Sequence, residues 1–332
     1  MSIPVVAFFN NKGGVGKTSL VYHLAWMYSD LGLRVLAADL DPQANLSAAF
    51  LEEDLLETVW EAGHATAAQC VYPLIQGTGD IWRADPMLQS DALALMVGDL
   101  ALSAFEQQLS DVWPRCSDRD PRAFRVTSAF WRIMQKAAEE HRADVILMDI
   151  GPNLGAINRA ALIAADYVVV PLSPNLFSLQ GLRNLGPTLA RWRAEWQERV
   201  PKNPVKDLPL PAGRMEPAGY IVQQHSVRLD RPVKAYERWI GRIPQVYSQY
   251  VLEVKPPPGL TLEDDPHCLA LLKHYRSLVP MAQEARKPVF HLKAADGAIG
   301  AHLAAVQDAY KDFRRLARKI AGRISLVLPT TP

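Results

Sequence analysis

The residues best suited to bind an anion lie near the N-terminal end of the chain. Residues 10–19, NNKGGVGKTS, combine glycines with two lysines and two hydroxyl side chains. Glycines allow backbone N–H groups to approach phosphate oxygens without a Cβ in the way. Lys17 supplies a positive charge for the outer phosphates of a nucleotide, and Thr18 supplies a hydroxyl that can ligate Mg²⁺. We therefore predict that a nucleotide is bound by Asn11, Gly13, Gly14, Val15, Gly16, Lys17, Thr18 and Ser19.

The elements on either side of these residues support a phosphate loop. An apolar run from Ile3 to Phe9 precedes them and is typical of a buried parallel strand. A helical pattern from Lys17 to Leu31 follows, with Gly32 as its expected C-terminal cap. The N-terminal end of such a helix directs free N–H groups and the positive end of its dipole at the anion. The alternative, a glycine-rich turn with two solvated lysines, is disfavoured by this position between a strand and a helix.

Acidic residues follow two further predicted strands. Asp39 and Asp41 come after the apolar run from Val35 to Ala38, and Asp149 follows the run from Val145 to Met148. Mg²⁺ and an attacking water both need carboxylates at the strand ends beside the phosphate loop. A buried carboxylate such as that of Asp149 is costly unless a cation or hydrogen bonds compensate it, so we expect it to face Mg²⁺ through water. The alternative for Asp41 is a turn that simply ends the strand at Pro42.

These motifs together resemble those of the ParA/MinD family of P-loop ATPases. The resemblance rests on the segments KGGVGKTS at residues 12–19 and DLDPQAN at residues 39–45. The standard pattern GxxxxGK[ST] has a glycine where this chain has Asn11, and Lys12 corresponds to the additional lysine of the deviant Walker A motif. The resemblance implies that Lys12 reaches across a homodimer to the nucleotide of the other subunit, while Lys17 acts within its own subunit.

The resemblance also implies the remaining roles at the site. ATP and Mg²⁺ are the implied cofactors, and ATP hydrolysis to ADP and phosphate is the implied reaction. Asp41 would orient or activate the attacking water, so that Lys12, Lys17 and Asp41 form the catalytic group. Thr18, Asp39 and Asp149 would form the metal site.

The resemblance covers most of residues 3–50 and 143–190. Residues 279–289 are similar to the final strand and loop of the family, which makes Pro280 and Met281 candidates for contact with adenine. One of two prolines that usually follow the second acidic strand is replaced here by Gly151, which leaves the conformation of that loop open. Residues 51–142 match poorly.

The order of apolar runs and helical patterns predicts one α/β domain spanning residues 1–332. Strand and helix alternate, which indicates a doubly wound, mostly parallel sheet flanked by helices, and the resemblance implies a P-loop NTPase fold of the SIMIBI type. We expect residues 51–142 to form a partly helical insertion and residues 254–267 to form a loop. Further predicted strands are Tyr167–Val170 and Gly219–Val222, and further predicted helices are Leu88–Leu109, Thr127–His141, Leu179–Arg199 and Gly300–Arg323.

Composition sets limits on the class of protein. The chain has 332 residues and a formal net charge of +1, so total charge does not indicate a nucleic-acid partner. Cys70, Cys116 and Cys268 lie far apart, which argues against a disulfide framework or a local metal site and fits a reducing cytosol. We see neither a signal-peptide pattern nor a long uncharged apolar stretch, and we expect a cytoplasmic protein.

The distribution of basic residues favours a role in DNA partitioning. In this hypothesis the ATP-bound homodimer binds DNA nonspecifically on the nucleoid, and a ParB-like protein stimulates hydrolysis and release. The alternative for each cluster is a solvated helix face. The candidate DNA contacts are Arg183, Arg191, Arg193 and Arg199 on one helix, and Lys311, Arg314, Arg315, Arg318 and Lys319 on the last.

Two other hypotheses remain open. A MinD-like protein would position itself on a membrane through an amphipathic helix, and the helix at residues 300–323 is amphipathic. However, its long apolar stripe suits docking on the sheet of its own domain. A metabolic enzyme with the same phosphate loop is the third class, of which the iron–sulfur carriers would need paired cysteines. The apolar stripe of the helix at residues 300–323 consists of Leu303, Val306, Tyr310, Phe313, Leu316 and Ile320.

Overall fold

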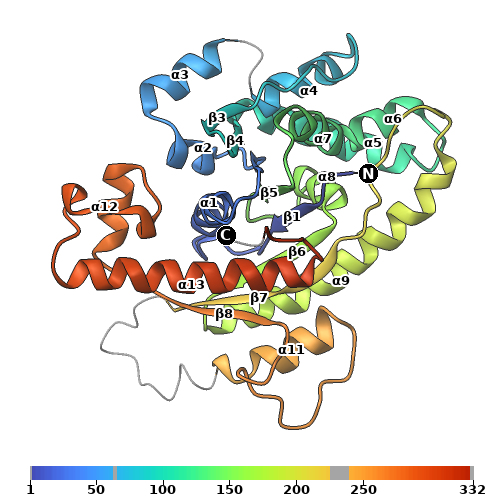
Figure 1. The fold of residues 1–332 in the computed structure, drawn as a ribbon. Helices are drawn as coiled ribbons and strands as arrows, with labels where there is room; N and C mark the ends of the chain where they lie inside the picture. The colour runs from blue at the N-terminus through green and yellow to red at the C-terminus, as the bar shows by residue number, and fades with distance from the viewer. Residues whose placement is uncertain (1, 63–65, 225–238, 330–332) are drawn as a thin grey trace.

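The computed structural model describes residues 2–62, 66–224 and 239–329, and a sheet runs through the centre of this part of the chain (Figure 1). The sheet has eight strands in the order β3-β4-β2-β5-β1-β6-β7-β8. Every neighbouring pair is parallel except β3 and β4, which are antiparallel. The predicted doubly wound, mostly parallel sheet is thus confirmed. The strands are β1 (Val5–Phe8), β2 (Val35–Asp39), β3 (Met87–Ser90), β4 (Leu93–Met96), β5 (Val145–Asp149), β6 (Tyr167–Leu172), β7 (Glu216–Gln224) and β8 (Cys268–Lys273).

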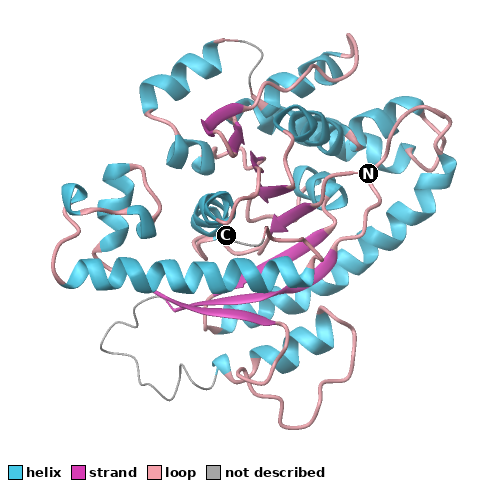
Figure 2. Ribbon diagram, viewed as in Figure 1, coloured by secondary structure: helices cyan, strands magenta, loops and turns pink. Residues whose placement is uncertain are grey.

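Helices cover both faces of the sheet (Figure 2). One hydrophobic cluster joins one face to helices α4 to α9 and α11, and the other joins the opposite face to α1, α2, α3, α12 and α13. Burial on both sides explains why the central strands are continuous apolar runs. The helices are α1 (Lys17–Asp30), α2 (Asn45–Phe50), α3 (Glu53–Glu61), α4 (Ala67–Gln76), α5 (Phe105–Arg115), α6 (Pro121–Thr127), α7 (Ala129–His141), α8 (Ala156–Ala164), α9 (Leu176–Arg199), α11 (Ile243–Tyr250), α12 (Leu278–Ala285) and α13 (Ala301–Arg323).

The register of the central strands brings the predicted acidic residues together. Asp39 at the end of β2 is paired with Asp149 at the end of β5, and Phe8 of β1 is paired with Asp149 from the other side. Since the strands are parallel, their carboxyl ends lie at one edge of the sheet, where the phosphate loop also begins. The predicted helix after that loop is confirmed as α1, and Gly32, with φ of +85°, donates its N–H to Ser29 O just beyond the helix end.

The prediction of a helix over Leu88–Leu109 is wrong. This segment forms β3, β4 and a 3₁₀ turn (Leu100–Ala104), and α5 begins only at Phe105. Leu93 and Leu95 join one core cluster while Ala94 and Met96 join the other, as in a strand that is buried on both faces. A short, continuous apolar run does not distinguish such a strand from a buried helix.

Two other predictions need correction. Residues 279–289, expected as a strand and loop, contain α12, while the strand of this region is β8 and precedes it. The helix expected over Thr127–His141 is α7, which begins at Ala129 after a separate short helix. The region 51–142, expected to be partly helical, contains strands as well as helices, and its strand β4 pairs with β2 and extends the central sheet.

The C-terminal helix α13 lies along β7 and β8 (Figure 1). Its residues Val306, Phe313, Leu316 and Ile320 are buried in the cluster that includes α1, as the predicted docking on the domain requires. Leu303 differs from the prediction, since 44% of its surface is exposed.

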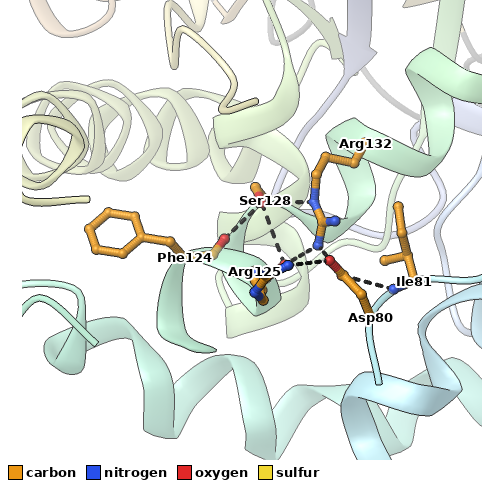
Figure 3. Close-up of polar contacts among 6 residues, drawn as sticks. All are labelled: Asp80, Ile81, Phe124, Arg125, Ser128 and Arg132. Carbon is orange, nitrogen blue, oxygen red and sulfur yellow. Dashed lines mark hydrogen bonds and ion pairs between the residues drawn. The ribbon is translucent and has the colours of Figure 1, made fainter. Parts of the chain in front are cut away.

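A cluster of ionic contacts anchors the segment between α4 and β3 to α6 and α7 (Figure 3). The carboxylate of Asp80 accepts hydrogen bonds of 2.7 Å from both Arg125 and Arg132. The Arg132 side chain is buried and also bonds Ser128 Oγ. Burial alone would raise the pKa of Asp80, but hydrogen bonds from Arg132 and from the Ile81 backbone outweigh this effect and lower it.

We expect Asp80→Ala to lower the free energy of unfolding by about 2–3 kcal/mol, because the buried Arg132 guanidinium loses its carboxylate partner. Denaturant unfolding of both proteins measures the difference. Arg83→Ala is the control, since it removes an exposed ion pair with Glu140 and should cost less than about 1 kcal/mol. Equal losses in the two variants would contradict a special role for the buried arginine.

Candidate nucleotide-binding site

A cleft of about 760 Å³ opens at the carboxyl ends of the strands. This edge is where parallel α/β sheets bind ligands. One end of the cleft is lined by Gly13, Gly14, Gly16, Lys17, Thr18 and Ser19 of the predicted phosphate loop, together with Asp41 and Pro152. Asn11 and Val15, which were also predicted to bind nucleotide, do not line it.

The loop conformation depends on its glycines and on Asn10. Gly14 and Gly16 have φ of +71° and +74°, where side chains other than glycine are strained. The Asn10 amide donates to Pro171 O at 2.6 Å, and its oxygen accepts from the Lys12 backbone N–H at 3.0 Å. The loop is thereby fixed to the end of β6.

Lys17 projects into the cleft and is buried. Its Nζ lies 3.4 Å from two carbonyl oxygens of the loop, those of Asn10 and Lys12. Burial lowers the pKa of the Lys17 ammonium, while the carboxylates of Asp149 and Asp41 oppose that shift. The side chain is therefore close enough to the loop to neutralise a phosphate group bound there.

Asp149 has the features of a group that faces a cation. It is fully buried, and its Oδ2 accepts a hydrogen bond of 2.6 Å from Thr18 Oγ1. Its Oδ1 has no hydrogen-bond partner among the described residues. Burial and the carboxylates of Asp39 and Asp41 raise its pKa above the usual value, although Thr18 and Lys17 act in the opposite direction. A hydroxyl and a carboxylate with a free oxygen are donors that suit Mg²⁺.

Asp39 and Asp41 have different surroundings. Asp39 is buried and does not line the cleft; its Oδ2 accepts from the backbone N–H and the hydroxyl of Ser47 at 2.8 and 2.7 Å. Its Oδ1 accepts from the backbone N–H of Asp41 at 3.3 Å. Asp41 lines the cleft, and its Oδ1 accepts from the Gln43 backbone N–H at 3.0 Å. Asp39 thus orders the turn that presents Asp41.

Lys12 points away from the cleft. Its Nζ lies 3.4 Å from Asn175 Oδ1 and 5.5 Å from the centre of the Phe177 ring, both at the start of α9. Phe177 is 70% exposed, and the adjacent Leu176 is 52% exposed. The ammonium group therefore lies outside the cleft, beside an exposed apolar surface.

The other end of the cleft differs from the prediction. Pro280 and Met281 do not line it, whereas their neighbours Val279, Ala282 and Gln283 do, because α12 turns these side chains toward the cleft. Several other lining residues were not predicted from the sequence, because they come from elements far apart in the chain. Among them are Tyr22, His23, Asn45, Gln223, Tyr275, Arg286 and Phe313.

The comparisons with known proteins agree with this geometry. Residues 3–201 match the family model described as an AAA domain (AAA_31). Protein IncC of Escherichia coli is 34% identical over 184 residues, which are 55% of this chain and 45% of that protein. The chromosome partitioning protein ParA of Caulobacter vibrioides (strain NA1000 / CB15N) is 29% identical over 196 residues, 59% of this chain and 66% of that protein. The matched segments thus span about half to two thirds of the length of these relatives.

Solved structures share the fold. The DIP2308 protein of Corynebacterium diphtheriae has a TM-score of 0.72 at 22% identity, with 97% of this chain and 99% of that one covered. MinD of Pyrococcus horikoshii, solved with Mg-ADP, has a TM-score of 0.56 at 15% identity, with 96% of each chain covered. Fold and phosphate loop define a P-loop nucleotide-binding protein. The chain belongs, more specifically, to the ParA/MinD family of P-loop ATPases.

His23 connects α1 to the segment that follows α12. Its Nε2 accepts from the Val289 backbone N–H at 3.1 Å, so the proton is on Nδ1, which lies 2.6 Å from Ser19 O. The ring stacks on Phe313 with a centroid distance of 4.8 Å. Burial lowers the pKa of His23 to about 4.

The free energy of unfolding should therefore decrease as the pH falls from about 6.5 toward about 4, by roughly 3 kcal/mol in total from His23. The sign follows because the unfolded chain binds a proton in this window and the folded protein does not. His23→Gln should remove this part of the pH dependence, measured by denaturant unfolding at several pH values. Parallel pH profiles of the two proteins would contradict the assignment.

Proposed function

We propose that the protein binds ATP with Mg²⁺ in the cleft and hydrolyses it to ADP and phosphate. The observation that carries the proposal is the meeting of Lys17 Nζ, Thr18 Oγ1 and the buried Asp149 carboxylate at one glycine-lined loop. The backbone N–H groups of this loop, the start of α1 and Lys17 bind the phosphates. Thr18 and Asp149 would hold Mg²⁺, which when bound offsets negative charge on the phosphates.

Asp41 is the residue that we assign to the attacking water. It lines the cleft on the same side as the phosphate loop, and its turn is fixed by Asp39 through the Asp41 backbone N–H. A carboxylate there can accept a hydrogen bond from water and orient it toward the terminal phosphate. Asp39 supports the metal site indirectly, since its own oxygens are occupied by Ser47 and Asp41.

The position of Lys12 supports a homodimer as the active form. Its ammonium group lies outside its own cleft, at an apolar surface that includes Leu176 and Phe177. A second copy of the chain docked on this surface would bury the apolar side chains and bring Lys12 to the nucleotide of that copy. Both effects favour association when ATP is bound.

We expect Lys12→Ala to bind ATP but to form no ATP-dependent dimers, because the charge that acts on the other subunit is lost. Light scattering of the protein with ATP and with ADP measures the dimer, and nucleotide binding is measured separately. The matched variant is Asp41→Ala, which should form dimers with ATP while turnover falls by about a hundredfold or more. ATP-dependent dimers of Lys12→Ala would contradict the role of Lys12 in dimerisation. Normal turnover of Asp41→Ala would contradict the role of Asp41 in hydrolysis.

The basic residues of α13 are the better candidates for contact with DNA. Lys311, Arg314, Arg315, Arg318 and Lys319 line a shallow hollow of about 420 Å³. The candidates on α9 are largely engaged in the fold: Arg193 donates to the carbonyls of Arg214 and Met215, and Arg183 stacks on Tyr250. Arg199 stacks on Trp113, and only Arg191 is exposed.

We propose that the ATP-bound dimer binds DNA nonspecifically through α13, and that it acts in plasmid or chromosome partitioning with a stimulating partner protein. The family supports this role, since its relatives include chromosome partitioning proteins. The MinD-like alternative would need the apolar face of α13 for lipid, but that face is buried against the sheet and α1. The described helices include none with the length and hydropathy required to cross a bilayer.

Arg315→Ala/Arg318→Ala should weaken ATP-dependent DNA binding and reduce the slope of log K against log salt by about 2, because two phosphate contacts are lost. DNA co-sedimentation at several salt concentrations measures both quantities. The control is Lys136→Ala/Lys206→Ala, which removes two exposed lysines outside α13 and should leave the slope unchanged. Retention on anionic liposomes in place of DNA would instead support the membrane hypothesis.

A further inference from the structure

The loop after β5, residues 151–155, borders the phosphate end of the cleft. Pro152 lines the cleft and packs against the phosphate loop, where a Cβ on Gly13 would lie 3.9 Å from its Cγ. Gly151 is buried beside Asp41, and a Cβ at this position would lie 3.3 Å from Asp41 Oδ1. The glycine therefore gives the Asp41 carboxylate room that a larger residue would take.

A glycine also makes this loop less rigid than a proline would, so other contacts must order it. Asn158 of α8 supplies them from within the core. Its side chain is 1% exposed, and its Nδ2 donates to Gly151 O at 2.8 Å and to Asn153 O at 2.7 Å. Both halves of the loop are thus tied to one amide group.

Glu106 of α5 orders the end of the loop from the other side. Its two carboxylate oxygens accept from the backbone N–H groups of Ala156 and Ile157 at 2.6 and 2.8 Å. These are the first two residues of α8, which has no capping side chain of its own. Gly155 permits the approach, since a Cβ there would lie 2.7 Å from Glu106 Oε1.

We propose that Asn158 and Glu106 are positioning residues for ATP hydrolysis, because together they hold residues 151–155 against Asp41 and the phosphate loop. Neither side chain lines the cleft, so they act through the loop. The inference rests on the proposed ATPase function. A displaced loop would move Asp41 relative to the terminal phosphate, and a shift of about 1 Å can cost two orders of magnitude in rate.

The test measures ATP hydrolysis and nucleotide binding in Asn158→Ala and Glu106→Ala. We expect kcat to fall by about ten- to a hundredfold while the Kd for ADP changes by less than about threefold. Glu106→Gln keeps one accepting oxygen and should have an intermediate kcat. Gly151→Ala should lower kcat in the same way, since its Cβ crowds Asp41 while the Asn158 and Glu106 bonds remain.

Arg159→Ala is the matched control. Arg159 also joins α8 to α5, through Leu109 O at 3.1 Å and the face of Trp113. Its only described hydrogen bond to residues 151–155 runs from its backbone N–H to Gly155 O, which the substitution keeps. Its kcat should stay within about twofold of the wild type. Wild-type kcat in Asn158→Ala and Glu106→Ala, or an equal loss in Arg159→Ala, would overturn this inference alone. A wild-type protein that does not hydrolyse ATP would overturn the proposed function, and this inference with it.

Discussion

The buried carboxylate of Asp149 is the group on which the arrangement of the site depends. It ends a fully apolar strand, beside Asp39 on the neighbouring strand, and one of its oxygens has no partner within the described structure. Such a group is costly unless donors or cations lie close to it. The start of α1, directly after the glycine-lined loop, supplies these in Thr18 and Lys17. The pairing of β1 with β5 brings the loop and the acid together.

The sequence predicted those parts of the site where a short motif lies between clear strand and helix patterns. β1, α1, β2, β5 and their acidic ends could be assigned because apolar runs, glycines and acids follow one another within short segments. β4 was missed because a four-residue apolar run has no distinct period, and β3 was missed because its sequence MLQS is half polar and only partly buried. β8 was missed because this edge strand is only partly buried. The far end of the cleft was not predictable, since its residues come from α1, β7, α12 and α13 and meet only in the folded chain.

Two departures from the family pattern have structural explanations of different kinds. Asn11, in place of a glycine, lies against α9, where a Cβ on Gly181 would be 2.7 Å from its side-chain oxygen. It therefore contacts the protein and leaves the cleft to the glycines that follow. Gly151, in place of a proline, lies beside Asp41, and its loop is ordered by residues of α5 and α8 that no motif contains. The sequence could indicate that this loop was unusual, but only the packing of distant helices explains its conformation.

Helix α13 links two surfaces that are chemically unlike. Phe313 forms part of the wall of the cleft, and the next two residues, Arg314 and Arg315, belong to the basic hollow. Because an α-helix is stiff over this length, the aromatic wall and the positive charges have a fixed spacing and orientation relative to one another. A tilt of this helix would change the width of the cleft and the orientation of the arginines in the same movement.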